Sequence, residues 1–328
     1  MVMKRVIQIV GSSIALLLVC LSPRGAIASD QKLAATEFVG STLGDALPRE
    51  FLGGLATNAP CHCITWHITL SAHDKAALSG VYNLTASYQV PTRDNTNRSE
   101  PGPKVAAKGR WEILKGTTSR PDAVIYRFTS EKSERSLSFL KVGENLLHLL
   151  GPDANLMVGN GGWSYTLNRA DRAEKPADES ATQEAPTTSY KIAPMATGPA
   201  VFGVFEGRSP CHGISRELKL PQYTGCTKVK WRVTLYQNPE TSAPTTYKVE
   251  GTLHRQTPRE GTWSIIQGAK TDPKAAVYQL NPTQTEAALL LLKADDNVLL
   301  FLNQDREPLV GNADFSYTLN RVAAKRVF

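Results

Sequence analysis

The sequence predicts an all-β protein made of two tandem small antiparallel β-barrels, joined by a linker rich in Pro, Ala, Glu and Thr. Three observations support this fold class. The 328 residues are about twice the length of a usual domain. The chain repeats itself at a fixed offset, and apolar and polar residues alternate with the period of two that marks a half-buried strand. A composition of 41% hydrophobic and 20% charged residues is typical of a folded globular protein.

Residues 1–28 have the features of a signal peptide. A positively charged start precedes an apolar run, Val6–Leu21, and the small-residue cleavage pattern that ends at Ala28. We therefore predict cleavage after Ala28 and a periplasmic location. Lipidation of Cys20 is the alternative and would give an outer-membrane lipoprotein. The apolar run is shorter than the ~20 residues that span a bilayer, so we expect no transmembrane segment.

The chain after the signal peptide is an internal repeat. At an offset of 152 residues the two copies match without a gap, and Ser164–Arg169 pairs with Ser316–Arg321. The same offset pairs Trp111 with Trp263, Gly116 with Gly268, Tyr126 with Tyr278, Leu140 with Leu292, and Val158 with Val310. Upstream the offset becomes 165 and pairs Trp66 with Trp231 and Tyr82 with Tyr247. The first copy thus has thirteen more residues, expected in a solvent-exposed loop around Pro91–Lys108.

The repeat defines the domain boundaries. We predict a first barrel over residues 34–170 and a second over residues 199–322. Residues 171–198 between them contain few large apolar side chains and are expected to form a flexible linker.

Period-two alternation assigns the inward faces of the strands. Trp66, Ile68 and Leu70 share one face, while His67 lies on the other. The same rule turns further residues inward, namely Tyr82, Leu84, Ala86, Tyr88, Trp163, Tyr165, Leu167, Phe315, Tyr317 and Leu319. About eight such runs in each copy favour a sheet that closes on itself, because closure removes exposed strand edges. A two-layer sandwich is the alternative.

The second copy resembles the NlpE family of envelope proteins. The pieces that carry the resemblance are Gly207–Cys211, Gly261–Trp263, Ala275–Tyr278 and the Leu-rich stretch Leu289–Leu302. The match is best over residues 202–320 and weaker over 51–169. It implies a lipocalin-like barrel and a role in copper resistance or envelope-stress signalling, here as a tandem of two such barrels.

Four cysteines of the predicted mature chain lie near the start of the two copies. In an exported protein an even number of cysteines favours disulfide bonds. We expect Cys211 to pair with Cys226, and a cramped Cys61–Cys63 bond is the weaker possibility. By its distance from the following Trp strand, Cys61 aligns with Cys226, so that His212–Gly225 looks like an insertion in the second copy.

A soft-metal site is the alternative interpretation of the first pair of cysteines. Cys61 and Cys63 lie two residues apart, with His62 between them and His67 nearby. Thiolates select Cu(I), which needs few ligands. Cu(I) is therefore the one cofactor that this alternative implies, and inert free thiols are the third possibility. Zinc is disfavoured because a closed tetrahedral set needs four ligands.

Other functional classes have less support from the sequence. The formal net charge is +7, but the basic residues are scattered, so we expect no nucleic-acid partner. No familiar catalytic motif occurs, so we predict that the protein is not an enzyme. A carrier of a small apolar ligand inside each barrel and a bivalent scaffold for an envelope protein are the alternatives. Neither the ligand-binding residues nor the oligomeric state is defined by the sequence.

Overall fold

The computed structural model describes most of the chain after the predicted signal peptide. The described residues are 34–72, 76–92, 99–117, 120–174, 183–184, 196, 198, 200–220, 223–254, 258–283 and 287–322. The predicted signal peptide with Cys20 and most of the predicted linker lie outside the described residues.

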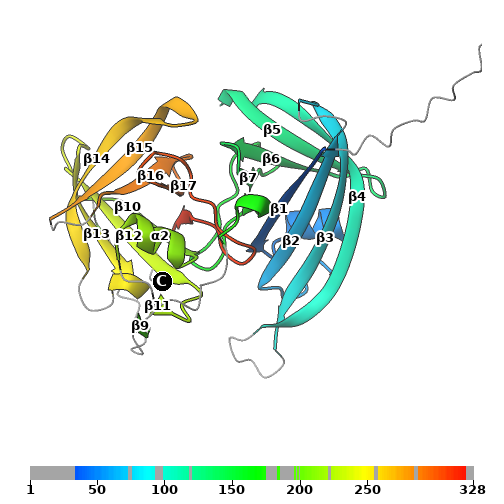
Figure 1. Cartoon of the computed structure of the whole chain (residues 1–328), viewed down its shortest axis with the longest axis horizontal. Helices are drawn as coiled ribbons and strands as arrows, with labels where there is room; N and C mark the ends of the chain where they lie inside the picture. Colours follow the sequence, from blue (N-terminus) through cyan, green and yellow to red (C-terminus); the bar gives the residue numbers. More distant parts are fainter. Residues whose placement is uncertain are drawn as a thin grey trace, which may run out of the picture. The chain divides into compact units, whose positions relative to one another are not determined.

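The first copy is a closed antiparallel barrel of eight strands (Figure 1). Its elements are β1 (Ala34–Leu43), α1 (Ala46–Leu52), β2 (Cys63–Ala72), β3 (Ser79–Pro91), β4 (Ser99–Thr117), β5 (Arg120–Ser130), β6 (Ser136–Val142), β7 (Leu146–Leu149), β8 (Thr166–Arg169) and the 3-10 turn η1 (Ala170–Arg172). Each strand pairs with the next along the chain, and β8 closes the barrel on β1, with Phe38 opposite Arg169.

The second copy repeats this barrel. Its elements are β10 (Val201–Ser209), α2 (His212–Glu217), β12 (Val229–Gln237), β13 (Pro244–Gly251), η2 (Thr252–His254), β14 (Arg259–Ala269), β15 (Asp272–Pro282), β16 (Leu289–Lys293), β17 (Val298–Leu302) and β18 (Thr318–Arg321). Closure again pairs the first and last strands, with Phe205 opposite Arg321. A short parallel pair, β9 (Gln183–Glu184) with β11 (Tyr223–Thr224), is separate from the barrels.

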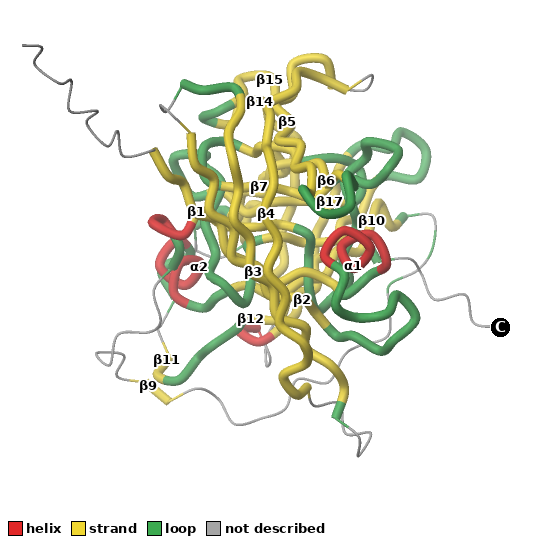
Figure 2. The backbone as a smooth tube through the Cα atoms, turned by 90° about the vertical axis from the view of Figure 1, so that its right-hand side faces the viewer, coloured by secondary structure: helices red, strands yellow, loops and turns green. Residues whose placement is uncertain are grey.

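The predicted fold class of two tandem closed barrels is therefore confirmed. Figure 2 shows how strands dominate the chain, with the two short helices in red. Helix α1 ends at Gly53, whose φ of 69° is the left-handed conformation that commonly stops a helix. Within the described residues, no helix is long and apolar enough to cross a membrane.

Large apolar side chains fill the interior of both barrels. Trp66, Ile68 and Leu70 point into the first core as the alternation predicts, whereas His67 is exposed. Tyr82 and Tyr88 are almost completely buried in the same core. Trp231, Tyr247, Phe301, Tyr317 and Leu319 occupy the second core. Large side chains of the described residues thus occupy the interior of each barrel and pack against one another.

A glycine allows the first strand of each barrel to cross the last one closely. A Cβ on Gly207 would lie 2.3 Å from the Thr318 carbonyl oxygen, which is closer than real Cβ contacts. The matching Gly40 in β1 lies against Thr166 and Leu167 of β8. Closure at this point therefore requires a residue without a side chain.

Two details of the prediction are wrong. The extra residues of the first copy lengthen the hairpin of β3 and β4, because β4 already begins at Ser99 within the predicted loop Pro91–Lys108. Trp163 and Phe315 are only half-buried and stay out of the two cores. Their rings instead face the cations of Arg208 and Lys228, at 5.2 and 5.9 Å respectively.

Candidate functional site

The predicted disulfide between Cys211 and Cys226 is present at the end of the second barrel where the chain passes from β10 through α2 to β12. We call this end of each barrel its mouth. The Cα atoms of the two cysteines are 6.0 Å apart, and the bond closes a loop with a sequence separation of 15. Cys211 directly precedes α2, while Cys226 precedes β12. The bond therefore ties both ends of the segment that carries α2 to the barrel wall.

The first barrel has one half of the same cross-link. Because Phe38 and Phe205 hold equivalent places in the closing ladders, the residue that matches Cys211 is Gly44. A Cβ built on Gly44 would lie 2.3 Å from the Cys61 Sγ atom. Cys61 thus occupies the place of Cys226, as predicted from its distance to the Trp strand, but has no cysteine opposite.

This equivalence corrects the predicted insertion of His212–Gly225. Both barrels have a helical segment between their first two strands, and α1 in the first copy corresponds to α2 in the second. Ala59–His62 and Ser209–His212 share the sequence Pro-Cys-His, but they are not equivalent, because they lie at opposite ends of the helical segment.

Cys61 and Cys63 are both free thiols in the structure. The Cys61 Sγ–H donates to the carbonyl oxygen of Cys63 at 3.4 Å. Burial raises the pKa of both thiols, and that of Cys63 reaches about 12. Cys61 packs against the core of the first barrel, whereas Cys63 lies outside that core and near the charges of Arg208 and Asp314.

The two histidines of the predicted Cu(I) site are engaged elsewhere. His62 Nδ1 is 2.6 Å from the Ser99 hydroxyl, and the exposed His67 has its Nε2 3.3 Å from a Glu37 carboxylate oxygen. Among the described residues, no group of three or more His, Cys, Asp and Glu side chains is placed to hold a metal. The structure therefore brings the two cysteines close in space but not the four predicted ligands, and a two-thiol Cu(I) site stays a prediction.

A buried tyrosine at each mouth donates to a carboxylate. The Tyr165 hydroxyl donates to Asp45, which directly precedes α1. The matching Tyr317 hydroxyl donates to Glu174 instead. Burial, as the main cause, raises the pKa of both tyrosines, so both hydroxyls keep their protons. The residue that matches Asp45 in the second barrel is His212, so the second mouth takes its carboxylate from outside the barrel.

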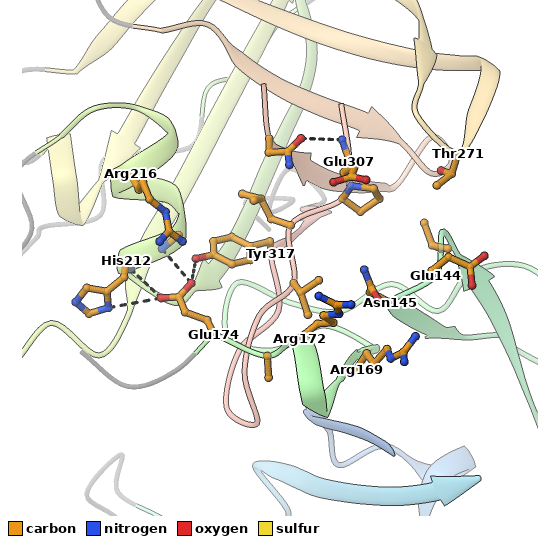
Figure 3. Close-up of a pocket in the computed structure, with 17 residues that line it drawn as sticks. Glu144, Asn145, Arg169, Arg172, Glu174, His212, Arg216, Thr271, Glu307 and Tyr317 are labelled. Carbon is orange, nitrogen blue, oxygen red and sulfur yellow. Dashed lines mark hydrogen bonds and ion pairs between the residues drawn. The ribbon is translucent and has the colours of Figure 1, made fainter. Parts of the chain in front are cut away.

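Glu174 comes from the segment that follows the first barrel, and it completes the second mouth (Figure 3). Its side chain is 9% exposed. It accepts hydrogen bonds from the backbone N–H groups of His212 at 2.8 Å and Gly213 at 3.0 Å, besides the one from Tyr317. Its own N–H donates to the Gly311 carbonyl oxygen at 2.8 Å. Sequence reasoning missed Glu174, because it lies in the predicted linker.

A polar pocket of about 1190 Å³ lies beside Glu174. Its acids already have partners, since Glu144 pairs with Lys141 and Glu307 with Lys270. Arg169 pairs with Asp171. Arg172 and Arg216 also line the pocket and make no ion pair with a carboxylate among the described residues. Because Glu174 is occupied by three donors, it is poorly placed to take a proton from a substrate.

Comparisons with family models, with curated proteins and with solved structures find no match to this chain. The fold and the site define the protein as a tandem of two closed β-barrels. Each barrel has cysteines at its mouth, and Glu174 after the first barrel contacts the mouth of the second.

Proposed function

We propose that the protein is a non-enzymatic, exported NlpE-like protein that acts in copper tolerance or envelope-stress sensing. One observation carries the proposal: Cys61 is a free thiol at the place where Cys226 closes the second mouth with Cys211, and Cys63 is a second free thiol two residues further on. A duplicated scaffold with a disulfide at one mouth and free thiols at the other suits a thiol-based response. The second barrel then supplies stability, and the first supplies the responsive site.

The two free thiols of the first mouth favour Cu(I) as its ligand. Cu(I) binds thiolates and accepts two-coordinate sites, so Cys61 and Cys63 are sufficient donors without His62 or His67. Cys61 is only half-buried and therefore within reach of an incoming ion. Because Cys61 packs against the core and Cys63 lies outside it, binding one ion by both sulfurs requires the Cys61 side chain to leave the Cys63 carbonyl and turn toward the Cys63 sulfur.

The test is a Cu(I) competition titration with a chromophoric chelator under reducing conditions. The Cys211→Ser plus Cys226→Ser variant is the parent protein, so that only the first mouth carries thiols. Adding Cys61→Ser and Cys63→Ser should abolish high-affinity binding of one Cu(I) per chain. Adding His62→Ala and His67→Ala is the matched control and should leave the affinity unchanged. Equal affinity in the parent and the thiol-free variant rules the site out.

A carrier of apolar ligands has less support. Trp66, Tyr82, Tyr88 and Phe128 are among the largest fully buried side chains, and they occupy the space that a ligand would need in the first barrel. Delipidated protein is therefore expected to take up no fluorescent fatty acid. Saturable uptake of one fatty acid per barrel would favour the carrier over the sensor.

A further inference from the structure

Residues that match each other in the two copies also contact each other. Ser164 and Ser316 are 152 residues apart, and their hydroxyl oxygens are 2.7 Å apart. Thr166 and Thr318 have the same separation, with hydroxyl oxygens at 2.9 Å. All four residues are buried. A residue that touches its own copy lies on a two-fold axis, so β8 and β18 meet around a local two-fold axis.

Reciprocal contacts surround this axis. The Asn168 side chain accepts from the Gly311 N–H at 2.8 Å and donates to the Asn312 carbonyl oxygen at 2.9 Å. Asn320, the copy of Asn168, accepts from the Gly159 N–H at 2.7 Å and donates to the Asn160 carbonyl oxygen at 3.5 Å. Both asparagines are fully buried. Each barrel thus places its asparagine on the Gly-Asn loop of the other barrel. Such a reciprocal interface is called isologous and is the kind found in symmetric dimers.

The loop that receives each asparagine is built for this contact. A Cβ on Gly159 would lie 2.2 Å from the Trp163 carbonyl oxygen, and one on Gly311 would lie 2.1 Å from that of Phe315. Each loop therefore needs glycine, and its N–H points to the other barrel. The side chain of the following Asn160 accepts from the Gly162 and Trp163 N–H groups and holds the loop in shape. Each barrel thus has a complete half of the interface: a Gly-Asn loop and a Ser-x-Thr-x-Asn strand.

We infer that the face formed in each barrel by the Gly-Asn loop and the Ser-x-Thr-x-Asn strand is a self-complementary docking surface. It binds the other barrel of the same chain, and its further partner is the same face of a second copy of this chain. In this structure the two barrels of one chain cover each other's faces. When the linker cannot span the pair, the faces of two chains meet with the same contacts.

The rim of the interface differs between the two barrels. Arg208 of the second barrel lies over the Trp163 ring of the first and near Cys63. At the place that matches Arg208, the first barrel has Ser41, whose hydroxyl donates to the Ala313 carbonyl oxygen at 2.9 Å. Lys228, the residue that matches Cys63, already lies close to Arg208 within the second barrel, and this cation is one cause of the lowered pKa of Lys228 after burial. The second barrel therefore contributes two cations to the rim, and the first barrel contributes Ser41 and Cys63 at the matching places.

The length of the linker gives a direct test. Glu174 binds at the α2 end of the second barrel, and the chain must return to Val201 at the other end of β10. Nine residues of strand cover about 27 Å. Deleting residues 176–199 leaves two residues between Glu174 and Val201, which reach at most about 11 Å for three peptide steps. The barrels of one shortened chain then cannot pair with each other without losing the Glu174 contacts.

We expect the shortened chain to form a two-chain assembly, with twice the mass by light scattering after size-exclusion chromatography. Ser164→Cys plus Ser316→Cys, placed in a Cys61→Ser plus Cys63→Ser background, reports the contact itself. The new disulfide should lie within one chain at the natural linker length and join two chains in the shortened protein. A folded, monomeric shortened chain, or no cross-link at the natural linker length, overturns the inference.

A second measurement covers a shortened chain that fails to fold. A site-specific protease sequence inserted between residues 185 and 190 of the full chain allows cleavage after folding. Two cleaved preparations with different affinity tags on their first and second halves should exchange halves when mixed, and uncleaved preparations should not. Halves that separate after cleavage, or that never exchange, count against a self-complementary surface.

Discussion

Gly44 lies directly against the Cys61 sulfur, at the place where the second barrel has Cys211 bonded to Cys226. The space for a side chain at position 44 is taken by the Cys61 side chain, whose Cβ is 2.7 Å from the built Cβ. The first mouth thus has one of the two sulfurs of the cross-link, but the two Cβ atoms would have to move about 1 Å apart to reach the ~3.5–4.5 Å of a disulfide.

Gly44→Cys is expected to restore this cross-link. Oxidation should consume the Cys61 thiol and stabilise the first barrel by at most about 3 kcal/mol, the chain-entropy value for a loop of this length, because the shift that separates the two Cβ atoms costs part of the gain. Thiol titration and denaturant unfolding measure the two effects. Gly44→Ser is the matched control and should destabilise the protein, because its side chain meets the Cys61 sulfur without a bond. A Gly44→Cys protein with all its thiols free would contradict the prediction.

Glu174→Ala should lower the free energy of unfolding by about 2–3 kcal/mol. The change leaves the Tyr317 hydroxyl and the N–H groups of His212 and Gly213 without their acceptor in a buried place. Denaturant unfolding gives the value. Glu144→Ala is the control, since that exposed carboxylate makes only a surface ion pair, and its loss should cost well under about 1 kcal/mol. Equal effects of the two changes would mean that Glu174 does not complete the mouth.

Asn168→Ala and Asn320→Ala should cost the same stability, about 2 kcal/mol each. Each change removes two hydrogen bonds of one reciprocal set and leaves a buried glycine N–H unpaired. The local two-fold relation predicts values that agree within about 1 kcal/mol in denaturant unfolding, and exposed Asn155→Ala serves as the control. A large effect at one asparagine and none at the other would show that the interface is not symmetric in energy.

Cu(I) binding by the first mouth should strengthen as the pH rises. Burial raises the pKa of Cys61, and it raises that of Cys63 to about 12, so both thiols are protonated near neutral pH. Below these pKa values each thiolate that binds the ion releases a proton. The affinity therefore increases by up to about tenfold per thiolate for each pH unit and weakens in acid. Competition titrations at pH 6, 7 and 8 measure this slope, and an affinity independent of pH would exclude thiolate ligands.

The fold was predictable because strand alternation and duplication agree. The alternation placed Trp66, Ile68 and Leu70 inward on local pattern alone, and the repeat showed that the second copy follows the same plan. Alternation failed for Trp163 and Phe315 because it describes a strand, whereas these residues precede β8 and β18. Their aromatic faces pair with cations outside the cores.

The site was predictable only in part. The Cys211–Cys226 bond followed from cysteine number and spacing. Gly44 carried no signal by itself, and only the alignment of β1 with β10 reveals it as the position of the absent cysteine. Glu174 was hidden because its role depends on a contact across the repeat boundary, which composition assigns to a linker.

The place of Glu174 in the chain also bears on the order in which the molecule assembles. If the chain is exported as proposed, it folds as it emerges across the membrane, and the N-terminal barrel emerges first and can fold as a unit. The carboxylate that Tyr317 needs is then already attached to the first barrel when the last strand of the second emerges. The first barrel then supplies a contact that the second barrel needs in order to complete its fold. A fragment that starts at residue 199 must fold with the Tyr317 hydroxyl and the N–H groups of His212 and Gly213 lacking the hydrogen-bond acceptor that Glu174 provides.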